Sequence, residues 1–357
     1  MLERSNPTWP YFMNMQKLTK LHPGDKIAIL SPSFAAPGMF PEVFELGLKR
    51  LQEIFQLEPV EYPTTHKLGA TTDERIQDFI HAFQNPDIKA VVASIGGDDQ
   101  VTYIKRLPTE PFIKNPKPFF GYSDNTHFNN FLWLNGIPSF YGGAVMTQLA
   151  MQMKMDDYTI NYLKKAFFDS GECELTASET FNEVGLDWSD LTNLQKQRSY
   201  EKNDGWFWDG ISKTEGITWG GCVESVDELL RHGIQIPSLE EFENVILIME
   251  TSEEMPSADY VARVYRALGE RGILERIKGL LVGRAKAWEF GKPYTVEQRK
   301  KYREDQQQTT LKIVRAYNKK IPIVQNIDFG HTDPQIPMPY GMPCKIDGLS
   351  KKIFITF

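Results

Sequence analysis

A serine stands where a predicted strand gives way to a predicted helix, in the stretch GYSDN. Ser123 lies two residues after Gly121 and directly before Asp124. A turn of this kind projects the hydroxyl away from the sheet, and the helix N-terminus beside it offers unpaired N–H groups to an oxyanion. Asn125 replaces the second glycine of the G-x-S-x-G motif, so the match is partial. The stretch alone predicts either a catalytic nucleophile or a Ser or Asp helix cap.

Two consecutive glycines follow the preceding predicted strand, in the stretch SIGGDDQ. Gly96 and Gly97 can bring backbone amides close to a ligand, as an oxyanion hole or an anion cradle requires. The alternative is a tight turn that Asp98 or Asp99 caps. Because this strand comes just before the Ser123 strand, we expect the two loops to open at the same edge of one sheet.

An acid closes the apolar strand VILIME, and it is out of keeping with its neighbours. Glu250 would lie at the carboxyl end of that strand, where binding sites of parallel sheets are found. Beside a histidine, such a carboxylate orients the imidazole and stabilises its cation. A structural salt bridge or a capping role is the alternative.

The choice of a general base is narrow because the chain has six histidines. His331, in IDFGHTDPQ, follows a predicted strand into a glycine turn, and we favour it. His127 competes, since it lies one helical turn after Ser123. A base at that place would point along the helix flank and away from the turn. A loop histidine that bonds to the backbone is the alternative reading of His331.

The first half of the chain alternates strand and helix patterns from Ile27 to about Ser170. The helix pattern is clearest at Thr71 to Phe83, where a Thr/Asp start leads into apolar residues at helical spacing. The predicted strands are Ile27 to Ser33, Leu57 to Pro63, Ala90 to Gly96, Pro118 to Ser123 and Pro138 to Gly143. This alternation predicts an α/β fold with a parallel sheet covered by helices on both faces.

A polar segment from Phe181 to Lys213 breaks the pattern and is predicted as a linker with a long loop that carries three tryptophans. Beyond it, strands are predicted at Asn244 to Thr251, Gly279 to Ala285 and Ile321 to His331, helices at Ser257 to Ile277 and Val296 to Asn318, and a hairpin about Asp347 and Gly348. We expect an N-terminal domain over residues 1–175, a linker over 176–215 and a C-terminal domain over 216–357.

Composition excludes several classes of protein. The 357 residues are 41% hydrophobic and 24% charged, as in ordinary globular proteins, and the net charge of −7 disfavours a nucleic-acid partner. The longest apolar runs are strand-sized, so no membrane attachment is expected, and the N-terminal residues lack an apolar signal core, so we expect a cytoplasmic protein. The three cysteines are far apart, which indicates neither a disulfide framework nor a zinc site. Cys222, after two glycines, is a minor alternative nucleophile.

Taken together, these segments resemble the serine peptidases of the LD-carboxypeptidase type. The resemblance covers nearly the whole chain and follows the family's order. It is carried by GDKIAILSPS (Gly24 to Ser33), IGGDD (Ile95 to Asp99), FGYSD (Phe120 to Asp124), WGGCVES (Trp219 to Ser225), LIMETSEE (Leu247 to Glu254), VGRAK (Val282 to Lys286) and FGHTDPQ (Phe329 to Gln335).

The resemblance implies a Ser–Glu–His triad of Ser123, Glu250 and His331. It implies an oxyanion hole from the backbone amides of Gly97 and Asp124, a homodimer, and a reaction that needs no metal or other cofactor. The fold it implies has an N-terminal parallel, flavodoxin-like domain and a smaller β-rich C-terminal domain, with the active site at their junction.

Two branches of the family compete for the substrate. One trims the terminal D-alanine of murein tetrapeptides, and the other is similar to the microcin C self-immunity peptidase, which cleaves an aminoacyl group from a modified adenylate. The tryptophan-bearing stretch NDGWFWDG favours the second branch and suggests that Trp206 or Trp208 stacks on a base. Gly96 and Arg284 are further candidates for substrate binding. Core anchors for the tryptophans and a structural ion pair for the arginine are the alternatives, and a non-catalytic nucleotide- or peptide-binding protein is the rival function.

Overall fold

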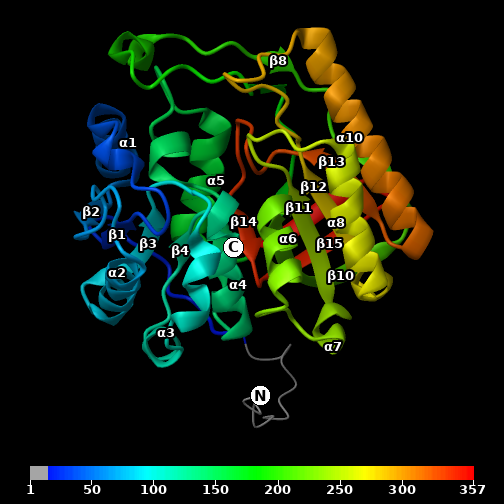
Figure 1. Ribbon diagram of the computed structural model, residues 1–357, viewed down its shortest axis with the longest axis horizontal. Coiled ribbons are helices and arrows are strands. Elements are labelled where there is room, and N and C mark those ends of the chain that lie inside the picture. The colour runs from blue at the N-terminus through cyan, green and yellow to red at the C-terminus, as the bar shows by residue number, and fades with distance from the viewer. Residues whose placement is uncertain (1–14) are drawn as a thin grey trace.

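The computed structural model describes residues 15–357 and contains two sheets that lie side by side (Figure 1). The first half of the chain supplies five strands of a six-stranded sheet in the order β14-β5-β4-β3-β1-β2. Its strands are β1 (Lys26–Leu30), β2 (Glu58–Glu61), β3 (Ile88–Ala93), β4 (Phe119–Phe120), β5 (Ser139–Tyr141) and β14 (Met338–Tyr340). Strands β1 to β5 are parallel in the flavodoxin-like order 2-1-3-4-5, and β14 adds an antiparallel edge.

Helices cover both faces of this sheet, as Figure 1 shows. They are α1 (Pro41–Phe55), α2 (Thr72–Gln84), α3 (Glu110–Lys114), α4 (Thr126–Leu134) and α5 (Asp157–Phe168). Alternation along β1 explains the two layers, because Ile27 and Ile29 join a core with α1 and α5 while Ala28 and Leu30 join a core with α2, α3 and α4. A capping box at Thr71 fixes the start of α2.

The second half builds an eight-stranded sheet in the order β6-β16-β15-β10-β11-β12-β13-β9. Its strands are β6 (Glu172–Leu175), β9 (Phe207–Asp209), β10 (Lys213–Cys222), β11 (Val245–Glu250), β12 (Gly279–Gly283), β13 (Ile323–Ile327), β15 (Pro343–Asp347) and β16 (Lys352–Thr356). Strands β10 to β13 are parallel, and the remaining pairs are antiparallel. The helices of this half are α6 (Val223–His232), α7 (Leu239–Phe242), α8 (Ala258–Glu270), α9 (Ile273–Arg276) and α10 (Val296–Tyr317).

Short elements fill the connections. They are η2 (Ala36–Gly38), η3 (Gln100–Thr102), η4 (Ile104–Arg106), η5 (Ser123–Asn125), η6 (Val145–Leu149), η7 (Leu191–Gln195) and the two-stranded ribbon of β7 (Thr180–Phe181) and β8 (Glu201–Lys202). The predicted α/β fold, with a parallel sheet and a second β-rich sheet, is confirmed.

The two sheets exchange edge strands. Strand β14 comes from the second half of the chain but pairs with β5, and β6 comes before residue 176 but pairs with β16. The predicted domain limit near residue 175 therefore falls after a strand that already belongs to the second sheet. Among residues 15–357, no helix has the length and apolar character needed to cross a membrane.

Candidate active site

A cavity of about 710 Å³ opens between the two halves, and we call it the junction cavity. This volume is within the range of small-molecule sites, about 300 to 1,000 Å³. Its walls come from the segments after β1, β3, β4 and β5, from the polar segment 182–198, and from the loops after β11, β12 and β13. The residues used below that line it are Phe40, Gly96, Gly97, Ser123, Trp188, Arg198, Glu253, Glu254, Lys286, His331 and Asp333.

Ser123 lies at the sharp turn that the sequence predicts after β4. Its φ of 63° is in the left-handed region, which a serine rarely adopts and which is typical of a nucleophile on a strained strand-to-helix turn. Ser123 is not a helix cap. The N-cap residues of η5 and α4 are Tyr122 and Asn125, and neither makes a side-chain capping hydrogen bond. The turn therefore presents the Ser123 hydroxyl to the junction cavity.

The glycine pair after β3 lies directly against this turn. A Cβ atom at Gly96 would lie 2.9 Å from Cβ and 3.1 Å from Oγ of Ser123, and 3.4 Å from the amide nitrogen of Asp124. Gly97 has a φ of 156°, and a Cβ there would meet Ser33 Oγ at 2.1 Å. The absence of side chains thus lets this backbone approach the hydroxyl, as the oxyanion-hole prediction requires.

Glu250 and His331 are brought together from the ends of β11 and β13. His331 Nδ1 lies 2.7 Å from Glu250 Oε2, and both side chains are buried. Gly330, with a φ of 94°, makes this approach possible, because a Cβ there would lie 2.3 Å from the same oxygen. The hydrogen bond leaves Nε2 as the nitrogen available for other partners.

A second carboxylate occupies that nitrogen. Glu253 Oε2 lies 3.0 Å from His331 Nε2. Burial acts to lower the pKa of His331, but the charges of Glu250 and Glu253 and the hydrogen bonds to them raise it to about 10. Burial also acts to raise the pKa of Glu253, and the His331 cation outweighs this and lowers it to about 2. No pattern within LIMETSEE singles out Glu253.

Tyr141 is a second residue that sequence reasoning missed. Its hydroxyl donates to Glu250 Oε1 at 2.5 Å and accepts from the backbone N–H of Ser123 at 3.1 Å. Burial, with the nearby Glu250 charge, raises the pKa of Tyr141 well above its usual range, so the hydroxyl keeps its proton. The end of β5 thereby links the Ser123 turn to the carboxylate. A tyrosine before two glycines at a strand end was the available signal.

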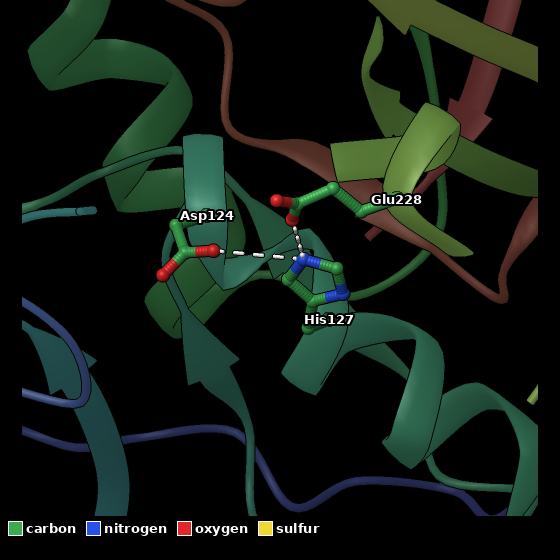
Figure 2. Close-up of side chains that lie close together, drawn as sticks. All are labelled: Asp124, His127 and Glu228. Atoms are coloured by element: carbon green, nitrogen blue, oxygen red, sulfur yellow. Dashed lines mark hydrogen bonds and ion pairs between the residues drawn. The ribbon is translucent and has the colours of Figure 1, made fainter. Parts of the chain in front are cut away.

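Asp124, the residue after Ser123, forms a cluster with His127 and Glu228 (Figure 2). His127 Nε2 lies 2.9 Å from Glu228 Oε2 and 3.6 Å from Asp124 Oδ1, and all three ligand-type atoms lie within 4.8 Å of one another. Metal-bound histidines usually donate their other nitrogen to a partner, whereas His127 Nδ1 is buried without one among the described residues. We therefore describe the cluster as a hydrogen-bonded link between His127 of α4 and Glu228 of α6. His127 faces this link and not the Ser123 hydroxyl.

The two predicted stacking tryptophans lie outside the junction cavity. Trp206 Nε1 donates to Asp328 Oδ2 at 3.0 Å, and Trp208 belongs to β9 and pairs with Val324 of β13. These are the contacts of core anchors. Trp188 lines the junction cavity instead, with its ring 5.5 Å from that of Phe40 in an edge contact.

Arg284 and Cys222 are also placed away from the junction cavity's lining. Arg284 is 1% exposed, donates to Asp328 Oδ1 at 2.5 Å and lies over the Phe181 ring. These contacts are those of a structural ion pair. Lys286, two residues later, does line the cavity. Burial and the neighbouring glutamates raise the pKa of the Cys222 thiol well above its usual range, which disfavours the thiolate that a nucleophile needs.

Comparison with known proteins identifies the family. The model of the LD-carboxypeptidase N-terminal domain matches residues 27–142, and that of the LD-carboxypeptidase C-terminal domain matches residues 215–346. The chain therefore belongs to the LD-carboxypeptidase family. This membership supports a serine carboxypeptidase and confirms the predicted resemblance.

Three relatives illustrate the range of the family. The Microcin C7 self-immunity protein MccF of Escherichia coli is 25% identical over 344 residues, covering 93% of both chains. A probable murein peptide carboxypeptidase of Bacillus subtilis is 24% identical over 341 residues, covering 94% of this chain and 92% of the relative. The structure of an MccF-like protein from Streptococcus pneumoniae in complex with AMP is 28% identical, with a TM-score of 0.81 over 93% of this chain and 98% of that one.

Proposed function

We propose that this protein is a serine-type carboxypeptidase or amidase that hydrolyses a C-terminal amide bond, using Ser123, Glu250 and His331. The observation that carries the proposal is the convergence of the strained Ser123 turn and the Glu250–His331 pair on one cavity, from loops far apart in sequence. Nucleophile, base and orienting carboxylate are the three parts of a hydrolase triad.

The proposed mechanism follows from these positions. Glu250 holds His331 through Nδ1, so neutral His331 accepts the Ser123 proton at Nε2 while the Ser123 oxygen attacks the substrate carbonyl. The amides of Gly97 and Asp124 stabilise the tetrahedral oxyanion, and losing one such donor typically costs about 10² to 10³ in rate. His331 then protonates the leaving amine, and water hydrolyses the acyl-enzyme to release the acid.

We propose aminoacyl- or peptidyl-adenylate compounds as the substrate class, with resistance or detoxification as the outcome. A solved MccF, 25% identical with a TM-score of 0.81 over 95% of this chain and 98% of that one, is in complex with aspartyl sulfamoyl adenosine. Trp188 offers a ring for a purine at the wall of the junction cavity, and stacking is worth about 1 to 3 kcal/mol per base. Lys286 supplies a cation there for a phosphate or its mimic.

The murein tetrapeptide is the alternative substrate, favoured by the likeness to the Bacillus subtilis relative. Incubating the protein in parallel with a murein tetrapeptide and an aminoacyl-sulfamoyl adenosine tests the choice. We expect cleavage of the nucleoside compound, and cleavage of the tetrapeptide alone would overturn this substrate assignment.

The rival function is a binding protein without catalysis. Ser123→Ala should abolish hydrolysis, and a serine-reactive probe should label the wild-type protein at Ser123 over time. Full activity in that variant, or no labelling, would contradict the proposed triad. A homodimer and a cytoplasmic location stay predictions from the sequence, and analytical ultracentrifugation of the full chain tests the first.

A further inference from the structure

Glu253 contacts His331 Nε2, the nitrogen that accepts the Ser123 proton in the proposed mechanism. It follows β11 within the loop after Glu250, and its carboxylate lies 3.0 Å from His331 Nε2. The Ser123 hydroxyl makes no hydrogen bond to another described residue, although it lines the same cavity. In this resting arrangement the base is engaged by an acid, and the nucleophile is not engaged by the base.

Of the two partners, Glu253 is the one with room to move. The His331 side chain is 7% exposed, is bonded to Glu250 and meets the Tyr122 ring edge-on at 4.9 Å. The Glu253 side chain is 50% exposed. A change of Glu253 rotamer would therefore release Nε2, whereas turning the imidazole would break its bond to Glu250.

The side chains of the cavity do not offer Glu253 another direct ion pair. Arg198 pairs with Asp333 at 2.7 Å, and Lys286 is 3.8 Å from Glu289, although its charge helps to lower the pKa of Glu253. A cation that replaces His331 as the partner of Glu253 must then be part of the substrate. Because Nε2 works beside the scissile carbonyl, that cation must be close to the carbonyl carbon.

We infer that Glu253 binds the α-ammonium group of the substrate's acyl residue and selects for substrates that have one. This inference rests on the proposed function and refines its substrate class. Aminoacyl nucleotides carry an α-ammonium next to the scissile carbonyl, whereas peptidyl nucleotides and murein tetrapeptides have an uncharged amide there. Binding of the ammonium moves the carboxylate from His331 to the substrate and leaves Nε2 to Ser123.

The proton balance is consistent with this exchange. In the resting state the imidazole is charged, with Nδ1–H donating to Glu250 and Nε2–H donating to Glu253, and its raised pKa of about 10 reflects both carboxylates. When the ammonium neutralises Glu253, only Glu250 still holds the imidazolium. The Nε2 proton leaves to solvent, and the neutral ring can then accept the proton of Ser123.

The test compares alanyl-sulfamoyl adenosine with its N-acetyl derivative, which differ at the α-amine alone. We expect wild-type kcat/KM to favour the free amine by about tenfold or more, since a charge-assisted hydrogen bond is lost in the other. Glu253→Gln should bring the ratio close to one. Glu254→Gln is the matched control, because Glu254 lines the same cavity without a contact to His331, and it should keep the wild-type ratio.

Two results would overturn the inference: equal cleavage of both compounds by the wild-type protein, or an undiminished preference in Glu253→Gln. Neither result concerns the proposed triad, which fails if Ser123→Ala keeps full activity or if the serine-reactive probe does not label Ser123. If Glu253→Gln does not fold, as judged by circular dichroism, Glu253→Asp serves instead. Its shorter side chain should reduce the preference while keeping the charge.

Discussion

In the proposed mechanism, the contacts of single residues around His331 determine when it can act as a base. The free enzyme must lose a proton from an imidazole whose pKa is raised to about 10, so activity should rise with pH over the range below that value. Removing the charge of Glu253 lowers this pKa. We expect the acid limb of the kcat/KM profile to move to lower pH in Glu253→Gln but not in Glu254→Gln, measured with one substrate across a pH series. An unmoved limb would contradict the contact at Nε2.

We propose that Tyr141 is a positioning residue that acts through Glu250 and the Ser123 turn. Tyr141→Phe removes the hydroxyl that both groups use while keeping the ring in the core. Loss of a hydrogen bond to a charged group is worth about 1.5 to 3 kcal/mol, so we expect kcat to fall about 10- to 100-fold with little change in KM. Steady-state kinetics measure this split. An equal loss in Tyr122→Phe, whose hydroxyl bonds to Thr147, would show a general packing effect instead.

At the scale of elements, the loop after β13 depends on one glycine to deliver His331. Gly330→Ala would place a Cβ against Glu250 Oε2 in a backbone conformation that alanine disfavours. Gly24→Ala is a control with a similar φ of 89° and nothing within 4 Å. We expect both variants to lose about 1 to 2 kcal/mol of unfolding free energy from backbone strain, while Gly330→Ala alone loses hydrolysis. Urea titration and activity assays distinguish the two effects.

The polar segment 182–198 supplies a wall of the junction cavity through Trp188. If Trp188 stacks on a purine, Trp188→Ala should weaken AMP binding by about 1 to 3 kcal/mol, measured by calorimetry. Trp206→Ala should lower the melting temperature instead, because its indole is bonded to Asp328. If AMP affinity were lost in Trp206→Ala alone, the stretch NDGWFWDG, and not Trp188, would supply the ring that stacks on the base.

Strand patterns predicted most strands of the two sheets, including the edge strand β2, but they missed the central strand β10 and the edge strands β6, β9 and β14. The cores of β1, β3 and β11 were found because long apolar runs mark buried parallel strands. The edges β6 and β14 were missed because short strands with polar residues or proline are specified by their neighbours and not by their own pattern. Strand ends likewise placed Ser123 and His331 on loops that border the junction cavity, with Glu250 beside His331.

The parts of the site that escaped prediction depend on distances between loops. Nothing in the spacing of LIMETSEE indicates that Glu253, and not Glu254, contacts His331. Similarly, VGRAK offers two cations, and only the fold shows that Arg284 is buried while Lys286 lines the cavity. Strand ends can be read from the sequence, whereas the side chains of a long loop that border a cavity are known only from the fold.

At the scale of the whole molecule, the exchanged edge strands join the two halves. His331 lies between β13 of the second sheet and β14 of the first. Separating the two halves would therefore disturb the pairing of strands in both sheets. We expect a single cooperative unfolding transition, with the loss of hydrolysis and of near-ultraviolet circular dichroism at the same urea concentration. Two separated transitions would show that the halves are independent.

The same exchange limits how such a chain can be recombined. If the chain were divided at residue 175, β6 would stay with the first half and β14 with the second. Each sheet would then lack one of its edge strands. Hybrid enzymes made by joining the first half of one relative to the second half of another would then have foreign backbone at both seams. For this fold, we expect new specificity to be obtained more readily by replacing segment 182–198 alone, which borders the junction cavity and supplies no strand to either main sheet.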